Sequence, residues 1–342
     1  MRREIKPLTG LRGVAALWVV ACHWVGPEVS GIAADIALHG YAAVDLFMIL
    51  SGYVLGMVYA PGFAPQIWSG FGRFLWQRIC RLYPLYALTT LVSLALSRED
   101  WPVDAIISNL LMTTTHLWEV DAINGPSWSI SVEITLNLFF PLFVLLCARL
   151  RAEWSVVVGL LCAAALVAVS VLDHRWNGGV AGALGTLDTR LMYLRCGPEF
   201  ALGMLCWRYR GRFASCGRSW VLVVVALAML AMTPFKSADL GFVAAACVLV
   251  IGLGAETSQV AALLGARVPH WLGVISFSLY LWHAPFLALR PILVGWLGGA
   301  MLANSLNLAL VLAVATISYH WFEGPVRRWL TLSPTSPSHR PG

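Results

Sequence analysis

The chain has 342 residues, of which 59% are hydrophobic and only 12% are charged, and its formal net charge is +6. A mean hydropathy of +0.76 excludes a soluble globular protein of this size. Apolar runs of about 20 residues recur between short polar clusters, so the sequence predicts an all-α polytopic membrane protein in contact with membrane lipids. The net charge does not require a nucleic-acid partner, and its distribution is more informative than its sum.

The 8 cysteines show no metal-ligand spacing. Most of them lie inside apolar runs, where cysteine packs as a small residue. We therefore expect neither a metal site nor a disulfide framework.

The apolar runs predict about ten transmembrane helices, which we expect to form a single domain over residues 1–330. The segment 101–120 contains Asp104, Asn109, His116 and Glu119, so it is expected to be interfacial or re-entrant on the outer side. Residues 331–342 are rich in Pro and Ser and are expected to be a disordered cytoplasmic tail. The predicted spans are 8–26, 38–60, 82–97, 128–148, 154–172, 191–207, 219–234, 240–256, 271–291 and 300–322.

Charge distribution supports this ten-span topology. With both termini cytoplasmic, the inner segments and span ends hold 17 of the 23 basic residues, as the positive-inside rule requires. Counting 101–120 as an eleventh span would reverse the predicted orientation of every later span across the membrane and would place the arginine-rich segment 208–218 outside. The basic residues left on the outer side are Arg98, Arg175, Arg190, Arg195, Lys236 and Arg290.

The first helix, 8–26, carries two ionisable residues. It follows a basic stretch but lacks a clear cleavage site, so we interpret it as a retained helix and not as a signal peptide. Arg12 and His23 lie about 20° apart around the axis and roughly 16 Å apart along it, and therefore share a face. Such a pair indicates a functional site. The alternative is that Arg12 reaches the headgroups while His23 is a hydrogen-bonded packing residue.

Three polar residues are predicted at a common depth. His23, Asp45 and Glu133 each lie within roughly 5–10 Å of the outer boundary of a predicted span. A carboxylate beside an imidazole fixes its tautomer and raises its basicity, so we assign these three residues to acid–base catalysis. The alternative is a buried structural network without chemistry.

Arg78 and Arg81 lie three residues apart and share a helical face at the predicted inner boundary. Paired guanidinium groups bind phosphates bidentately. Positive-inside bias and anionic headgroups also place arginines at this boundary, which is the plainer interpretation.

Further polar residues are candidates for substrate contacts. Ser129 and Glu133 lie at i and i+4, and Ser129 is expected to be a hydrogen-bonding partner, since no base is predicted beside it. Trp128 is expected to be an interfacial anchor. Tyr280 and His283 lie at i and i+3 deep in the ninth predicted span, where a histidine needs a partner.

Taken together, these motifs resemble the acyltransferase-3 family of integral membrane acyltransferases, which includes bacterial O-antigen, exopolysaccharide and Nod-factor O-acetylases and some macrolide acylases. The resemblance covers nearly the whole chain, and six motifs occur in order. They are Arg12 with His23 after ten intervening residues, AVDLFMILSGYVLG, Arg78 with Arg81, WSISVE, SLYLWH and SYHWFEGPVRR. Ala284 in place of an aromatic residue, and ITLNLFF after Glu133, depart from the pattern and bear on the shape of the acceptor pocket.

The resemblance implies an O-acyltransferase in the bacterial inner membrane that passes an acyl group, expected to be acetyl, from cytoplasmic acetyl-CoA to a saccharide hydroxyl. The saccharide would be a lipid-linked or exported glycan, such as an exopolysaccharide or lipopolysaccharide, made by a polysaccharide biosynthesis machinery. His23 would be general base or transient acyl carrier, and Asp45 or Glu133 would orient it. Arg12, Arg78 and Arg81 would contact the donor. Some relatives carry a fused esterase-like domain, for which 342 residues leave no room.

Three alternatives stay open at this point. An acyl relay would hand its group to a separate extracytoplasmic transferase. A transporter or flippase would use His23, Asp45 and Glu133 as a proton relay, but it predicts paired inverted repeats, which the sequence does not show. A structural scaffold gives no reason for charged residues to recur inside spans.

Overall fold

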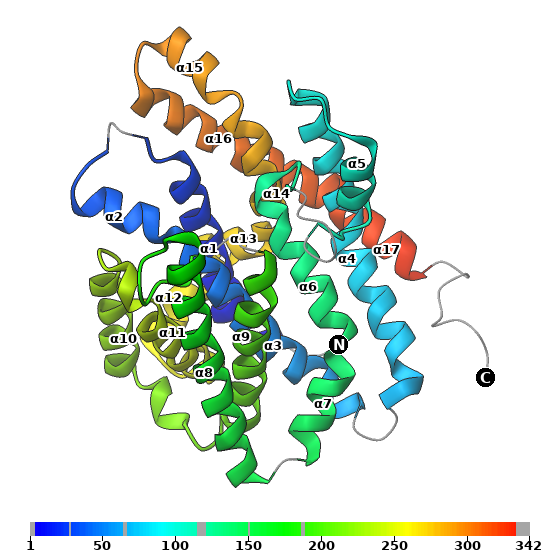
Figure 1. The fold of residues 1–342 in the computed structure, drawn as a ribbon, viewed down its shortest axis with the longest axis vertical. Helices are drawn as coiled ribbons and strands as arrows, with labels where there is room; N and C mark the ends of the chain where they lie inside the picture. The colour runs from blue at the N-terminus through cyan, green and yellow to red at the C-terminus, as the bar shows by residue number, and fades with distance from the viewer. Residues whose placement is uncertain are drawn as a thin grey trace. The chain divides into compact units, whose positions relative to one another are not determined.

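The computed structural model describes residues 4–26, 29–63, 67–114, 121–149, 151–185 and 189–332, and every regular element in these ranges is helical (Figure 1). The chain divides into two compact units. Unit 1 comprises Met1–Ile67 and Phe139–Val274, and unit 2 comprises Trp68–Leu138 and Ile275–Gly342. Most of the predicted tail, residues 333–342, lies outside the described ranges, as do His116 and Glu119, while residues 331 and 332 belong to the last helix.

Unit 1 contains ten α-helices and three 3₁₀ turns among the described residues. They are α1 (Lys6–Trp24), α2 (Ile32–Leu38), η1 (His39–Ala42), α3 (Ala43–Phe63), α7 (Phe140–Arg149), α8 (Ala152–Asn177), α9 (Thr189–Tyr209), η3 (Ala214–Gly217), α10 (Ser219–Met232), η4 (Lys236–Ala238), α11 (Asp239–Gly254), α12 (Gln259–Leu264) and α13 (Arg267–Val274).

Unit 2 is built around one long helix and the segments that pack on it. Its described elements are α4 (Ile67–Leu96), α5 (Val103–Leu110), η2 (Gly125–Ser127), α6 (Trp128–Leu138), α14 (Ser276–Leu287), α15 (Arg290–Leu297), α16 (Ala300–Ser318), the π-helical turn η5 (Tyr319–Glu323) and α17 (Gly324–Leu332).

Five helical segments in the described ranges are long and apolar enough to cross a membrane: Ile32–Ala60, Gly70–Leu96, Ala152–Asn177, Lys236–Gly254 and Ala300–Leu332. A sixth is formed if α14 and α15, which are bent by 64°, count as one broken span. The protein is therefore an all-helical membrane protein in its described parts. Each of the ten predicted spans contains a helix, but ten crossings and cytoplasmic termini stay predictions.

The helix boundaries differ from the predicted spans at two places. α4 begins at Ile67, well before the predicted start at 82. Arg78 was expected to end the apolar run, but its charge is compensated within the helix by an ion pair with Glu133. The predicted span 128–148 is broken at Phe139 into α6 and α7. The predicted interfacial segment contains the short helix α5, which at eight residues is too short to cross a bilayer.

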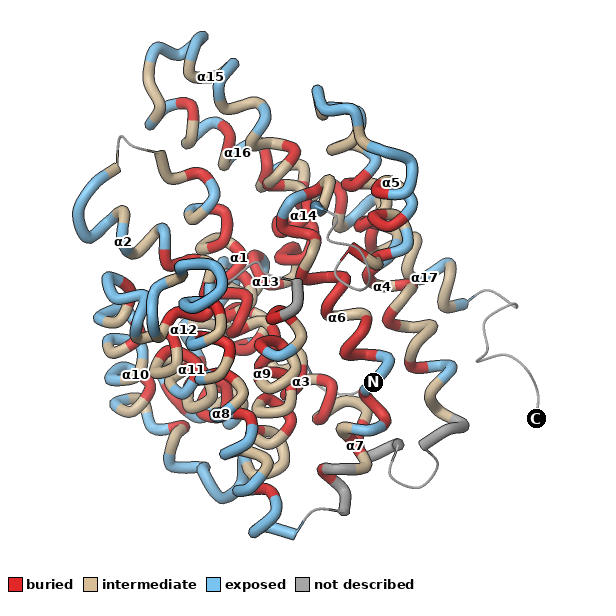
Figure 2. Tube along the Cα trace, in the orientation of Figure 1, coloured by how far each residue is buried: buried red, intermediate tan, exposed pale blue. Residues whose placement is uncertain are grey.

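The lipid-facing character of unit 1 is visible on α8 and α10. Figure 2 shows exposed residues interspersed along both helices, although both are apolar. A helix that exposes apolar residues is unfavourable in water but suited to hydrocarbon. The exposed apolar side chains on these two helices are Trp154, Val156, Val157, Leu160, Leu161, Val167, Val171, Trp176, Trp220, Val223, Val224, Leu227 and Leu230.

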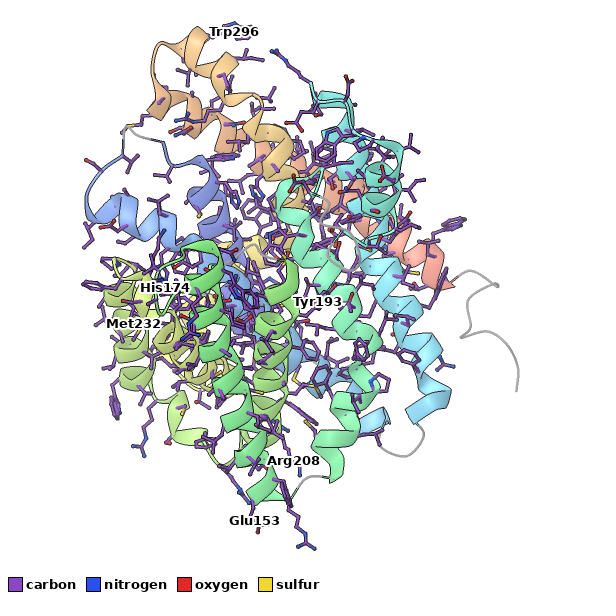
Figure 3. The ribbon with its side chains drawn as sticks, in the orientation of Figure 1. Glu153, His174, Tyr193, Arg208, Met232 and Trp296 are labelled. Carbon is purple, nitrogen blue, oxygen red and sulfur yellow. The ribbon has the colours of Figure 1, made fainter. Side chains whose placement is uncertain are left out.

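The start of α8 and the end of α9 lie together at one end of unit 1. Glu153 at the start of α8 and Arg208 near the end of α9 lie at one end of unit 1 in Figure 3, whereas His174 lies toward the other end of α8. Tyr209 Oη donates to Ser155 Oγ at 2.6 Å, which ties these two ends together. In unit 2, Trp296 on α15 points away from the helices and is 82% exposed (Figure 3).

The core of unit 1 is the pair α3 and α9, which pack at glycines. A Cβ at Gly52 would lie 2.0 Å from the Phe200 carbonyl oxygen, and one at Gly203 would lie 2.1 Å from the Ile49 carbonyl oxygen. Only glycine permits backbones this close, as is common between membrane helices. Gly56 similarly faces Trp207.

The contacts between α3 and α9 advance together along both chains, from Asp45 with Arg195 to Gly56 with Trp207, so the helices run parallel. Spans 38–60 and 191–207 also run in the same direction in the ten-span topology. An eleventh span between them would make them antiparallel. The parallel packing thus agrees with treating 101–120 as a non-spanning segment.

We predict that Gly203→Ala destabilises the protein by about 1–3 kcal/mol, because its methyl group overlaps the Ile49 carbonyl oxygen. The measurement is the thermal unfolding midpoint of the purified protein in detergent. Gly159→Ala in α8 is the matched control, since no heavy atom lies within 4 Å of the added Cβ. Equal midpoints for the two variants would contradict close packing at Gly203.

Candidate active site

In unit 1, α1 carries both Arg12 and His23. Arg12 is half-buried and His23 is exposed. His23 Nδ1 lies 2.9 Å from the Val19 carbonyl oxygen. Because a carbonyl oxygen only accepts, Nδ1 carries the proton, and the neutral ring has its lone pair on Nε2. This tautomer can accept a proton or attack a carbonyl carbon through Nε2.

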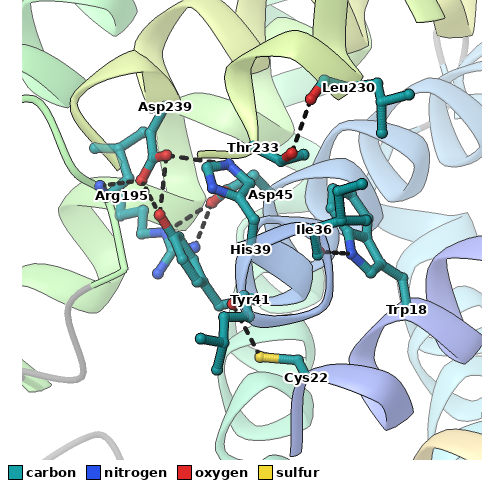
Figure 4. A network of polar contacts seen from close by, with 12 residues as sticks. Trp18, Cys22, Ile36, His39, Tyr41, Asp45, Arg195, Leu230, Thr233 and Asp239 are labelled. Atoms are coloured by element: carbon teal, nitrogen blue, oxygen red, sulfur yellow. Dashed lines mark hydrogen bonds and ion pairs between the residues drawn. The ribbon is translucent and has the colours of Figure 1, made fainter. Parts of the chain in front are cut away.

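Asp45, on the first turn of α3, pairs with an arginine that the sequence did not link to it. Arg195 Nε donates to Asp45 Oδ1 at 2.7 Å, and Arg195 Nη2 lies 2.5 Å from the same oxygen (Figure 4). Glu199 Oε1 lies 3.6 Å from Arg195 Nε, one turn along α9. Asp45 and Glu199 are 0% exposed and Arg195 is 2% exposed. Asp45 was expected to orient His23, whereas the structure places its carboxylate on Arg195.

Asp239, a further buried carboxylate of unit 1, was missed by sequence reasoning. Tyr41 Oη donates to both of its oxygens at 3.0 Å, and the Leu184 amide donates to Oδ2 at 2.7 Å. His39 Nε2 lies 3.3 Å from Oδ1 (Figure 4). The available signal was that His39 and Asp239 both lie at the ends of apolar runs.

In unit 2, Arg78 of α4 forms an ion pair and hydrogen bond with Glu133 of α6. Arg78 is 5% exposed and lies within Gly70–Leu96, a helical segment long enough to cross a membrane. The sequence placed Arg78 at the inner boundary and Glu133 near the outer one. The structure instead brings them into contact, since α4 extends past Arg78 to Ile67. Arg81, one turn further along, is half-buried.

The start of α6 is joined to α14 through hydroxyl groups. Ser129 Oγ and Tyr280 Oη lie 2.8 Å apart, and Tyr280 Oη donates to the Pro126 carbonyl oxygen at 2.8 Å. Asn124 Nδ2 donates to the Leu281 carbonyl oxygen at 3.0 Å. Among the described residues the partners of Ser129 Oγ are the Tyr280 hydroxyl and the Pro126 carbonyl, neither of which is the base that a serine nucleophile requires. Trp128, the first residue of α6, is half-buried.

His283 and Glu323 complete the polar groups along α14. His283 is 0% exposed, and its Nδ1 donates to the Tyr280 carbonyl oxygen at 2.6 Å, so the neutral ring also has its lone pair on Nε2. Ser278 Oγ donates to Glu323 Oε2 at 2.8 Å. Glu323 lies in the π-helical turn η5, a type of distortion that is frequent at functional sites.

Unit 2 therefore brings together five of the predicted site residues, Arg78, Ser129, Glu133, Tyr280 and His283, which come from three separate motifs. Unit 1 holds Arg12, His23 and Asp45. Groups of three or more His, Cys, Asp or Glu side chains suited to a metal ion do not occur among the described residues. The chemistry that these groups offer is hydrogen bonding, phosphate binding by arginine, and proton or acyl transfer at an imidazole.

Comparison with known proteins decides among the chemistries that such groups allow. Residues 5–321 match a family model described as the acyltransferase domain of the acyltransferase-3 type. The chain belongs to the acyltransferase-3 family. The predicted family is thereby confirmed, and the chain is an acyltransferase in a family of membrane-bound enzymes.

Three curated relatives illustrate the family. A putative peptidoglycan O-acetyltransferase of Bacillus subtilis, YrhL, is 27% identical over 95% of this chain and 55% of its own length. The acyltransferase MdmB of Streptomyces mycarofaciens is 28% identical over 84% of this chain and 79% of its own. A putative membrane-bound transacylase of Komagataeibacter xylinus, BcsY, is 27% identical over 93% and 81%. The chain thus spans about half the length of the first relative. No solved structure matches the chain.

We predict that Arg195→Met destabilises the protein by about 3–5 kcal/mol, because it leaves the Asp45 and Glu199 carboxyl groups buried without a cation. The double variant Asp45→Asn with Arg195→Met removes both charges of the closest pair and should recover part of this loss. Thermal unfolding in detergent measures both. A double variant no more stable than Arg195→Met alone would show that the pair is not the source of the loss.

Proposed function

We propose that the protein transfers an acetyl group from acetyl-CoA on the cytoplasmic side to a hydroxyl of a cell-surface or exported saccharide. The family match over residues 5–321, with relatives named as peptidoglycan O-acetyltransferases, supports O-acetyl transfer. The observation that carries the proposal within this chain is the exposed His23 on α1, whose Nδ1 hydrogen bond to the Val19 carbonyl oxygen selects the tautomer with the lone pair on Nε2.

His23 Nε2 would act on the acceptor in one of two ways. As a general base it takes the proton of the acceptor hydroxyl while the oxygen attacks the thioester carbon, and the CoA thiolate leaves and is then protonated. As an acyl carrier it first forms an acetyl-imidazole with loss of the thiolate, and the acceptor hydroxyl then takes the acetyl group. Both routes exchange one thioester for one ester and need no other reactant.

The two predicted catalytic carboxylates are assigned by their partners. Asp45 is held by Arg195 and Glu133 by Arg78, so each carboxylate compensates a buried guanidinium charge. We therefore assign both residues to positioning their arginines. Arg12, Arg78 and Arg81 are the proposed donor contacts, because guanidinium groups bind the phosphates of CoA. Trp128, Ser129, Tyr280 and His283 are proposed to contact the acceptor, and the inner membrane is the proposed location.

His23→Ala is expected to lower acetyl transfer by about 10²–10⁴-fold, the usual contribution of a general base. The assay is transfer of radiolabelled acetyl groups from acetyl-CoA to glycan in membrane vesicles, with protein quantified in the membrane. His174→Ala is the matched control, since His174 is also exposed and its Nδ1 also contacts a backbone carbonyl, that of Gly179 at 2.6 Å. Full activity in His23→Ala would overturn the proposed function of this residue.

Arg81→Gln is expected to raise the KM for acetyl-CoA about ten-fold with kcat little changed, since a charge-assisted bond to phosphate contributes about 1.5–3 kcal/mol. Arg78→Gln alone should also reduce the amount of folded protein, because Glu133 loses its partner. Adding Glu133→Gln should restore folding but not the KM. The control is Arg98→Gln, at an exposed site two residues after the end of α4, on the outer side in the predicted topology. An unchanged KM in Arg81→Gln would indicate a purely topological arginine.

A further inference from the structure

The last two turns of α1 are hydrogen-bonded to the segment Ile36–Tyr41, which comprises the end of α2 and most of η1. Trp18 Nε1 donates to the Ile36 carbonyl oxygen at 2.6 Å, and Cys22 Sγ donates to the Leu38 carbonyl oxygen at 3.1 Å. At Gly40 the segment runs directly against the helix, since a Cβ there would lie 2.3 Å from the Trp18 carbonyl oxygen. The part of α1 that precedes His23 is therefore held from one side by this segment (Figure 4).

The segment is itself held from behind by Asp239, the first residue of α11. His39 and Tyr41 both reach its carboxylate, at 3.3 and 3.0 Å. The Leu184 amide, from a third stretch of chain, occupies Oδ2 at 2.7 Å and fixes the carboxylate plane. Asp239 and His39 are each 1% exposed. One buried carboxylate is thus contacted from distant stretches of the chain, and Tyr41 alone lies 198 residues from it in the sequence.

Ring packing connects this carboxylate to α1 directly. The His39 ring stacks on Trp18 with centroids 6.1 Å apart, and it lies 5.6 Å from the ring of Phe242 on α11. Trp18 also packs on Phe242 at 5.7 Å. A shift of His39 must therefore move Trp18, which lies one residue before Val19, the residue whose carbonyl holds His23 Nδ1.

We propose that Asp239 is a positioning residue for the transfer reaction. Through His39 and Tyr41 it fixes the segment Ile36–Tyr41, and this segment fixes the end of α1 so that His23 Nε2 keeps one orientation. The proposal rests on the function proposed for His23. Asp239 itself touches neither donor nor acceptor in this account.

The chemistry of residue 239 predicts a graded series. An asparagine keeps one oxygen for the Leu184 amide and the Tyr41 hydroxyl and turns its amide group toward His39 Nε2, which accepts this bond in the tautomer with the proton on Nδ1. Asp239→Asn therefore preserves most of the contacts. Asp239→Ala removes all of them and leaves buried donors unpaired. Tyr41→Phe removes one donor and keeps the ring that packs on His39 at 4.9 Å.

In kinetics, Asp239→Ala should lower kcat about ten- to hundred-fold, because a displacement of about 1 Å at a reacting group costs about 10²-fold. The KM for acetyl-CoA should stay within about two-fold, since the donor-binding arginines are unchanged. Asp239→Asn should recover most of kcat, and Tyr41→Phe should lie between. The matched control is Asp173→Ala, a buried carboxylate of the same unit whose side-chain bond goes to Asn177 four residues away at 2.9 Å.

Cys22 supplies a readout that does not depend on activity. Its thiol is bonded to Leu38 of the segment, so a loosened segment should raise the rate at which N-ethylmaleimide alkylates Cys22. Peptide mass spectrometry of the full-length protein in detergent separates Cys22 from the other cysteines. We expect a rise of several-fold in Asp239→Ala, a smaller rise in Tyr41→Phe, and none in Asp173→Ala.

The combined results separate the two proposals. Faster Cys22 labelling with a lower kcat and an unchanged KM supports the positioning role. Unchanged labelling in both Asp239→Ala and Tyr41→Phe overturns it, as does an unchanged kcat while His23→Ala is inactive. If His23→Ala stays active, the function proposed for His23 fails and the positioning role for catalysis fails with it, whereas faster Cys22 labelling would still show that Asp239 holds α1. If Asp239→Ala does not fold, Tyr41→Phe decides by the same criteria.

Discussion

Arg195 is 2% exposed inside a membrane-length bundle, and the acidic partner that it needs comes from a helix 150 residues earlier in the chain. A buried guanidinium without an anion is strongly destabilising, and Asp45 is the closer of the two acidic side chains beside Arg195, so packing α9 against α3 supplies the shorter ion pair. Unit 2 repeats the rule with Arg78 and Glu133, 55 residues apart. In each unit an arginine whose unpaired charge would be costly in the hydrocarbon determines which two helices pack together.

An ion pair of this kind also limits the distance between helices. Aspartate has a short side chain, so Asp45 reaches Arg195 only if the backbones of α3 and α9 lie close together. The glycines at 52 and 203 permit this approach, because any side chain there would overlap a carbonyl oxygen of the facing helix. Small residues and buried charges therefore act together on the same helix pair: the glycines set the separation, and the ion pair fixes the register.

Periodicity and hydropathy predict the helices because they are local properties, and each predicted span contains one. The start of α4 was predicted about 15 residues late, since Arg78 looks like a boundary residue until its contact with Glu133 is known. The joining of Ser129 to Tyr280 across 151 residues has no local signal either. Asp45 illustrates the same limit. Its place beside His23 was inferred from depth alone, whereas the partner that the fold selects is Arg195, 150 residues later in the chain.

The short stretch from the end of α2 to the first turn of α3 contacts three other helices of unit 1. Between Ile36 and Asp45 the chain contacts α1 through Ile36, Leu38 and Gly40, α11 through His39 and Tyr41, and α9 through Asp45. These contacts use backbone carbonyls, rings and carboxylates in turn, so no single substitution there is purely local. α1, which carries His23, is thereby fixed relative to two helices that it meets far from its own sequence. The His23 imidazole that we propose to react lies at an exposed helix end and is placed accurately only if that end is immobilised. The bonds from Trp18 to Ile36 and from Cys22 to Leu38 hold this end of α1.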